Sequence, residues 1–197
     1  MCIRDRPLTL RLNGYSTAQF GKCHEVAPYL ASPMGPFDAW PTGVGFEYFY
    51  GFIAGEANQD DGALYDGTSA GDPPKSEEEG YHLTEDLADK AIGWVHQQKA
   101  LMPDKPFFMY FAPGATHAPH HVPKEWADTY KGKFDEGWDV VREETFERQK
   151  RLGFIPEHSE LPARHEEISA WDAMPEALKP VLAREMEVYA GFLEHTD

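Results

Sequence analysis

The sequence predicts the α/β class, in which strands and helices alternate along the chain. Residues 15–20 and 107–111 are short apolar segments bounded by glycine or proline, a pattern typical of buried strands. Residues 82–101, between them, carry apolar side chains at helical spacing. Because a strand, a helix and a further strand follow one another, we expect both strands to lie in one sheet.

The N-terminal stretch differs from the rest of the chain. The first seven residues, MCIRDRP, are charged and lack the apolar segment of a signal peptide. They do not lead naturally into the segment that begins at Leu8, so we assign the predicted domain to residues 8–197. Residues 8–12 are expected to form the end of a short helix, which Asn13 and Gly14 terminate.

The first predicted strand ends at Gly21, and polar residues follow it at once. Lys22 and His24 are two residues apart, so on an extended segment their side chains point to the same side. In open α/β sheets, ligands bind outside the carboxyl ends of the strands. A cation and an imidazole in that position suit an oxyanion such as sulfate, phosphate or carboxylate. The alternative is a solvated lysine and a loop histidine, because this spacing is common by chance.

Residues 26–75 are rich in glycine, proline and aromatic residues and show no helical period. We expect long ordered loops there, with one short strand at residues 46–50. Phe46, Tyr48 and Tyr50 then either line an aryl pocket or belong to the core, and the core is the favoured interpretation. A group of polar side chains follows, for which a solvated acidic loop is favoured over a Ca²⁺ site: Glu56, Asn58, Asp60, Asp61 and Asp66.

The predicted helix has one apolar stripe, which consists of Leu83, Leu87, Ala91 and Val95. Ile92 lies beside this stripe. Thr84 is the expected N-cap, since a threonine hydroxyl can accept a hydrogen bond from a backbone N–H of the first turn. Pro103 ends the helix, and the second strand follows directly.

The second strand ends in a turn that carries three imidazoles. A positioned imidazole such as His117 is the commonest general acid or base, and it can also bind a metal. A polar loop without a chemical role is the third interpretation. His120 and His121 are adjacent, so their side chains are expected to point apart, which weakens the case for a site shared by both.

Three further helices are predicted in the last third of the chain, at residues 124–130, 139–152 and 182–192. A proline-rich loop at residues 155–162 separates the last two. The final residues carry no C-cap signal, so we expect the chain to end inside a helix.

Composition excludes several classes of function. A net charge of −16 argues against nucleic-acid binding, which needs a basic face. The sequence has no run of about 18 apolar residues, so we expect no transmembrane helix. Cys2 and Cys23 form neither a disulfide framework nor a zinc-ribbon pattern. Cys23 is beside His24 in sequence, but such neighbours seldom form a nucleophile–base pair in space.

Five stretches of the chain, in order, resemble the bacterial arylsulfatases of the formylglycine-dependent sulfatase family: NGYSTAQFGKCHE, GPFDAWPTGVGFEYFYGF, YHLTEDLADKAIGWV, DKPFFMYFAPGATHAPHHVPKEW and EMEVYAGFLEHTD. The resemblance covers residues 8–197 and implies the alkaline-phosphatase-like α/β sandwich, here incomplete and with long ordered loops. It also implies a sulfuric ester hydrolase whose substrate is a small-molecule sulfate ester. In the order of the family, this chain is the central part of one catalytic domain.

The resemblance implies roles for three residues. Lys22 matches the lysine that bonds the sulfate and the formylglycine hydroxyl. His24 matches the histidine that orients the hydrated aldehyde and helps to expel sulfate. His117 matches the histidine that contacts the sulfate and can protonate the leaving oxygen. His120 and His121 match no catalytic position of the family.

This chain contains no residues that match the nucleophile motif or the metal ligands of the family. The family nucleophile is a formylglycine made from the cysteine of a C-x-P-x-R motif, and the metal is Ca²⁺. Cys2 and Arg6 have the right spacing, but the proline is missing and Cys2 lies too close to Lys22. The Ca²⁺ ligands are also missing, so we expect both cofactors to belong to parts of the parent protein outside this chain. The isolated fragment is then expected to be inactive.

Two alternatives stay open. One is a sister hydrolase of the same superfamily that acts on phosphate or phosphonate esters. The other is a non-enzymatic, histidine-rich metal-binding module. The particular sulfate ester, the oligomeric state and the compartment of the bacterial parent, periplasmic or cytoplasmic, are not predicted.

Overall fold

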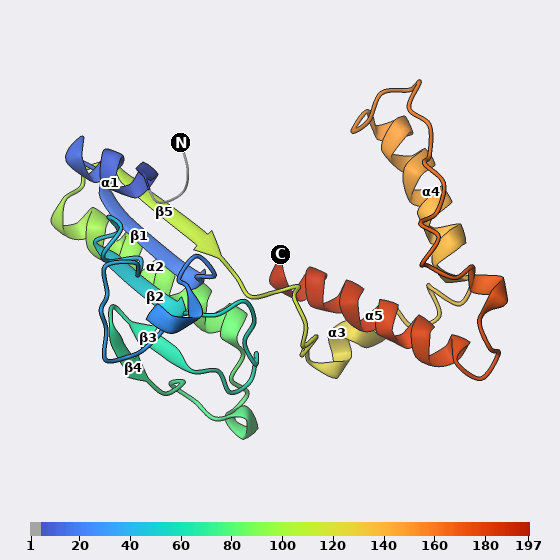
Figure 1. Ribbon diagram of the computed structural model, residues 1–197, viewed down its shortest axis with the longest axis horizontal. Helices are drawn as coiled ribbons and strands as arrows, with labels where there is room; N and C mark the ends of the chain where they lie inside the picture. The colour runs from blue at the N-terminus through green and yellow to red at the C-terminus, as the bar shows by residue number, and fades with distance from the viewer. Residues whose placement is uncertain (1–4) are drawn as a thin grey trace. The chain divides into compact units, whose positions relative to one another are not determined.

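The computed structural model describes residues 5–197. They form two compact units, of which the first ends at His121 and the second runs from Val122 to His195 (Figure 1). Within the described residues, no helix has both the length and the apolar character needed to cross a membrane.

The first unit is built on one five-stranded sheet with the strand order β4-β3-β2-β1-β5. The strands are β1 (Ser16–Lys22), β2 (Tyr48–Phe52), β3 (Leu64–Asp66), β4 (Ser69–Gly71) and β5 (Phe107–Ala112). β1 pairs in parallel with both β2 and β5, whereas β3 and β4 are antiparallel additions. This sheet, crossed by the helix α2 (Leu83–Leu101), confirms the α/β class (Figure 1).

The structure corrects the predicted end of the first strand. Gly21 does not terminate β1, because the strand continues to Lys22. The backbone of Gly21 has φ +99°, and a Cβ there would lie only 2.0 Å from the carbonyl oxygen of Ala112 in β5. Glycine is needed at this position because the neighbouring strand approaches so closely and φ is positive. Lys22 is therefore the last residue of the strand rather than the first residue after it.

The helix α2 is present as predicted and covers one face of the sheet, but its buried stripe differs in part from the predicted one. Leu83, Leu87 and Ala91 are buried, and the fourth core position is Trp94. The Trp94 ring packs edge-on against Phe20 of β1, with ring centroids 6.1 Å apart. The predicted Val95 only flanks this core. Trp94 precedes Val95 in the helix, and its larger side chain fills the position against the sheet that was predicted for Val95.

The N-cap of α2 is His82, not Thr84 as predicted. The imidazole Nδ1 of His82 accepts a hydrogen bond of 3.2 Å from the Thr84 backbone N–H. An acceptor at this position replaces the hydroxyl or carboxylate that usually satisfies the first turn of a helix. Since Nδ1 accepts, Nε2 carries the hydrogen and donates to the carbonyl oxygen of His121, 3.1 Å away.

The opposite side of the sheet carries a second core, formed by Cys23, Val26, Trp40 and Phe49. Trp40 donates its indole N–H to the Leu30 carbonyl at 2.8 Å, which ties the loop after β1 to this core.

The segment 26–75 is ordered in loops, as predicted, but it contains β2, β3 and β4 rather than a single strand. Phe46 and Tyr50 are buried, which confirms the interpretation of these aromatics as core.

Helix α1 (Asp5–Leu12) lies in the first unit, and the second unit contains α3 (Lys124–Asp128), α4 (Gly137–Leu152) and α5 (Lys179–Thr196). α3 packs closely on α5, since a Cβ at Gly191 would lie 2.7 Å from the backbone of Ala127. Glu187 is buried there and receives hydrogen bonds from Arg184 and from the Gly132 N–H, each of 2.7 Å. All three predicted helices exist, although α5 begins three residues earlier than expected.

Candidate active site

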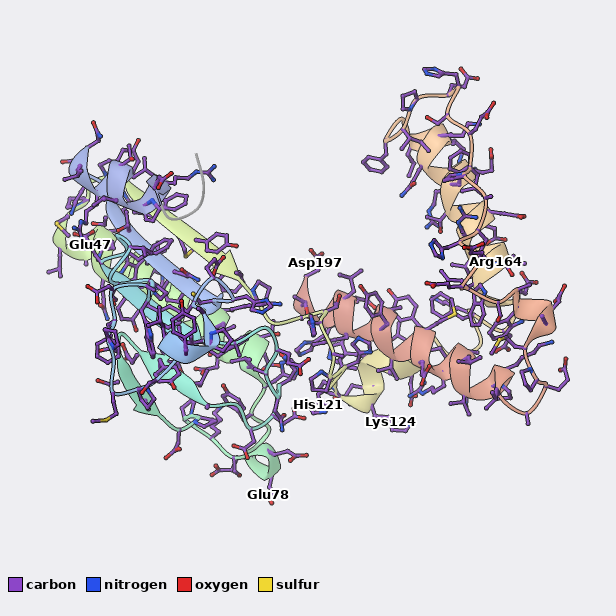
Figure 2. All side chains as sticks on the ribbon, viewed as in Figure 1. Glu47, Glu78, His121, Lys124, Arg164 and Asp197 are labelled. Atoms are coloured by element: carbon purple, nitrogen blue, oxygen red, sulfur yellow. The ribbon has the colours of Figure 1, made fainter. Side chains whose placement is uncertain are left out.

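The carboxyl ends of three parallel strands meet at one edge of the sheet. In the pairing of β1 with its neighbours, Lys22 lies opposite Phe52 of β2, and Gly21 lies opposite Ala112 of β5. The loops that follow β1, β2 and β5 therefore all leave the sheet at this edge. Figure 2 shows His121 near this edge and Glu47, which precedes β2, at the opposite end of the sheet. This is the edge at which ligands bind in open α/β sheets.

His24 lies against the loop that follows β2. A Cβ built on Gly55 would lie 2.7 Å from Cε1 and 2.8 Å from Nε2 of the His24 ring. The ring thus occupies the space that any side chain at position 55 would need. His24 itself is exposed, so its imidazole is accessible to a ligand. Lys22 is half-buried at the end of β1.

His117 contacts Glu56, the residue that follows Gly55 in the loop after β2. Its Nδ1 is 2.8 Å from the carbonyl oxygen of Ala118 and 3.5 Å from Oε2 of Glu56. A carbonyl oxygen can only accept, so Nδ1 carries the hydrogen and Nε2 is left as the position for a ligand. The side chain is half-exposed, which makes that position accessible.

His121 also contacts this loop. Its Nδ1 lies 3.1 Å from Oδ1 of Asn58 and 3.2 Å from Oδ2 of Asp60. Both partners are oxygens, so this imidazole is oriented by the loop in the same way as His117. The same residue accepts the His82 hydrogen bond through its backbone, which connects the site to the start of α2.

A buried glutamine anchors the loop. Gln59 is only 1% exposed, and its backbone carbonyl accepts a 2.7 Å hydrogen bond from the Leu83 N–H. A Cβ at Gly114, just after β5, would lie 3.1 Å from Nε2 of Gln59. In the described part of the chain, Oε1 of Gln59 has no hydrogen-bond partner. Residues 55–60, hereafter the bridging loop, are thus held between the segments that follow β1 and β5.

The bridging loop is the part of the site that sequence reasoning missed. Glu56 and Asn58 are exposed, as a solvated acidic loop predicts, but Glu56, Asn58 and Asp60 also contact imidazoles of a segment about 60 residues away, which was not predicted. A usable signal did exist: these residues follow the apolar run that ends at Ala54, as Lys22 and His117 follow theirs. The structure brings His24 and His117 to consecutive residues of one loop, Gly55 and Glu56.

Cys23 is unsuited to act as a nucleophile. Its side chain is buried, and burial, with the nearby carboxylate of Glu25, raises its pKa to about 12. The thiol donates a hydrogen bond of 3.3 Å to that carboxylate. The reactive form of cysteine is the thiolate, so this residue stays protonated and unreactive near neutral pH. Cys2 lies outside the described residues.

The residues present do not fit the calcium site that the resemblance implies. Between residues 5 and 197, no group of three or more histidine, cysteine or carboxylate side chains has the arrangement of a metal site. Ca²⁺ requires about six to eight oxygen ligands. The Asp60 carboxylate instead lies beside the imidazole of His121.

Comparison with known proteins relates the sequence of this chain to one family. A sequence model of a family described as Sulfatase matches residues 7–197. An arylsulfatase of Klebsiella aerogenes is 28% identical over 193 residues, which cover 93% of this chain and 39% of that protein. An uncharacterized sulfatase of Schizosaccharomyces pombe is 37% identical over 105 residues, which cover 52% of this chain and 19% of its own length. The chain thus spans well under half the length of these relatives.

Solved structures give similar matches. The crystal structure of Ps i-CgsB in complex with k-i-k-neocarrahexaose has a TM-score of 0.49 and 17% identity, and the match covers 95% of this chain and 34% of that one. The crystal structure of PsFucS1 sulfatase from Pseudoalteromonas sp. has a TM-score of 0.46 and 18% identity, and its match covers 63% of this chain and 29% of that one.

Proposed function

The chain belongs to the sulfatase family, and from that premise we propose that residues 8–197 are the central part of a catalytic domain that hydrolyses sulfate esters. Family membership brings with it the alkaline-phosphatase-like fold, to which the α/β sheet belongs. One observation carries the proposal. The carboxyl ends of β1, β2 and β5 lie at one edge, where the bridging loop contacts both His24 and His117.

Each proposed residue has a role that its position supports. Lys22 binds the sulfate through its ammonium group, which stabilises negative charge as the ester bond breaks. His24 orients the nucleophile and helps to release the sulfate. His117 acts as an acid in its imidazolium form, in which both ring nitrogens carry a hydrogen: it donates the Nε2 proton to the leaving oxygen and keeps the Nδ1 hydrogen, which the Ala118 carbonyl accepts. The alcohol then leaves as a neutral molecule rather than as an alkoxide.

Formylglycine and Ca²⁺ are proposed to come from parts of the parent protein outside residues 8–197. When present, they supply the attacking oxygen and further positive charge on the sulfate. The described residues contain no ligand set for the metal, so we assign it no contact here. The alternative function, a histidine-rich metal-binding module, likewise has no ligand set among residues 5–197.

The proposal is tested by comparing two histidines of one turn in the intact parent protein. His117→Ala should lower the turnover of an aryl sulfate roughly 10²–10⁴-fold, the usual contribution of a positioned acid or base. His120→Ala is the matched control and should have a much smaller effect, since we assign it no role. Initial rates with an aryl sulfate and the corresponding aryl phosphate measure both variants.

Three outcomes would contradict the proposal in different ways. Equal losses for the two variants would show that His117 is not the acid. A wild-type parent that turns over the phosphate faster than the sulfate would favour the sister phosphoesterase. Absence of turnover with either ester would remove the hydrolase proposal.

A further inference from the structure

The proposed site offers an ammonium group and two imidazoles to one anion, and carboxylates lie beside one of these imidazoles and beside a neighbouring one. Lys22, His24 and His117 suit a single sulfate group. Glu56 is 3.5 Å from the His117 imidazole, and Asp60 is 3.2 Å from the His121 imidazole. Both carboxylates come from the bridging loop: Glu56 lies beside a proposed sulfate-binding imidazole, and Asp60 lies beside His121, four residues further along the chain.

Stability does not explain the position of Glu56. Its side chain is 64% exposed and that of His117 is 50% exposed. A contact with this exposure contributes little to folding, because water and salt screen it. A carboxylate that contributes little to folding, yet lies next to the proposed acid, acts mainly through its charge on whatever binds there.

The acidic surface continues away from the imidazoles. Asp60 also lines a depression of about 400 Å³ whose ionisable lining consists of Asp60, Asp61, Asp72, Lys75, Glu77 and Glu78. Five of these six side chains are acidic. Asp60 belongs both to this depression and to the contact with His121, so the acidic side chains continue from the bridging loop to residues 61–78.

We propose that this acidic rim makes the site selective for monosulfated esters of neutral or cationic alcohols, with Glu56 and Asp60 as specificity-determining residues. The inference rests on the proposed function, because it assumes that Lys22, His24 and His117 bind the sulfate. A second anionic group on the alcohol would lie near the rim and be repelled. A hydroxyl or ammonium group would instead find carboxylates that accept its hydrogen bonds.

The physical basis is Coulomb repulsion at short range. Two like charges about 4 Å apart in water repel by roughly 1 kcal/mol, which is about a fivefold change in affinity. The net charge of −16 adds to this repulsion at low ionic strength. At about 1 M salt the screening length falls to about 3 Å, so the discrimination should nearly disappear.

The test measures binding of two non-hydrolysable anions to the parent protein by titration calorimetry. Benzenesulfonate carries one negative charge, and 1,3-benzenedisulfonate carries two. We expect the disulfonate to bind the wild type at least about fivefold more weakly at low salt. Glu56→Gln and Asp60→Asn should each recover roughly two- to fivefold of that loss, with little change for benzenesulfonate.

Asp104→Asn is the matched control, since Asp104 lies in the turn before β5, at the other end of that strand. It removes the same charge and should leave the ratio of the two dissociation constants unchanged. Disulfonate binding as tight as that of benzenesulfonate, or equal effects of the control and the rim variants, would overturn the inference. Hydrolysis of a phenyl sulfate in the same preparations tells whether the proposed function stands when the selectivity fails. If neither sulfonate binds and no ester is hydrolysed, both proposals fall.

Discussion

Gly55 is the residue that most directly sets the position of an imidazole in the proposed site. Any Cβ at position 55 would lie within 2.8 Å of two atoms of the His24 ring. The ring is an exposed side chain and can move, whereas the loop backbone is held by buried Gln59. A side chain at position 55 should therefore displace His24 without unfolding the unit.

Gly55→Ala in the parent protein should lower sulfatase turnover by roughly tenfold to a hundredfold. A displacement of about 1 Å is enough for an effect of that size when a reacting group must be aligned. The thermal midpoint should change little. Gly71→Ala is the control, because nothing lies within 4 Å of its Cβ position. Unchanged turnover in Gly55→Ala would show that the position of His24 does not limit the reaction.

The placement of three ionisable residues at or after strand ends was predictable, but their contact partners were not. Lys22, His24 and His117 follow apolar runs, and this local pattern is visible in the sequence. Their role stays a prediction until it is measured. Glu56 and Asp60 meet imidazoles across about 60 residues, and sequence patterns do not encode such long-range pairs.

Among the helices, α5 carries a buried carboxylate, Glu187, whose protonation affects stability. Burial tends to raise the pKa of Glu187, but hydrogen bonds from Arg184 and the Gly132 N–H outweigh it and lower the pKa below the ordinary 4.5. A carboxyl with a lowered folded pKa adds stability above its unfolded pKa. That stability is lost as the pH falls through the lower, folded value.

The thermal midpoint of the parent protein should therefore fall between about pH 5 and pH 3. Glu187→Gln should have a lower thermal midpoint than the wild type at neutral pH. Its thermal midpoint should also decrease less as the pH falls from about 5 to about 3. Thermal melts followed by circular dichroism at several pH values measure both. Glu185→Gln is the control, because Glu185 lies on the same helix and is exposed. Parallel pH curves for wild type and Glu187→Gln would contradict this role of Glu187.

Elements with a strong period were predicted, and short or interrupted elements were not. α2 and the strands at positions 16–22 and 107–112 have enough apolar residues to show their pattern. β3 and β4 have three residues each, too few for any period. The cap formed by His82 was missed because capping preferences favour hydroxyl and carboxylate side chains.

The sheet as a whole leaves β5 with one paired side. This strand lies at the end of the strand order, pairs with β1, and its six residues are at most half-buried. An exposed strand edge with this composition favours association with other chains. In the proposed function, the nucleophile and the metal also come from outside these residues.

We therefore predict that residues 8–197, produced alone, aggregate or melt without a sharp transition and do not hydrolyse an aryl sulfate, even with added Ca²⁺. Partial removal of a catalytic unit can cost nearly as much as complete removal. A thermal melt and an aryl sulfate assay test the two halves separately, with His117→Ala as the blank. A cooperative melt would refute the first half, and turnover above that blank would refute the second.

A crystal structure of the parent protein with benzenesulfonate bound would decide whether Lys22, His24 and His117 hold one anion together. We predict that the sulfonate oxygens lie within about 3.2 Å of the Lys22 Nζ, a His24 ring nitrogen and the His117 Nε2. The ring of the ligand should then face the bridging loop. A sulfonate bound elsewhere, or a His117 imidazole directed away from the anion that Lys22 holds, would contradict the proposed site.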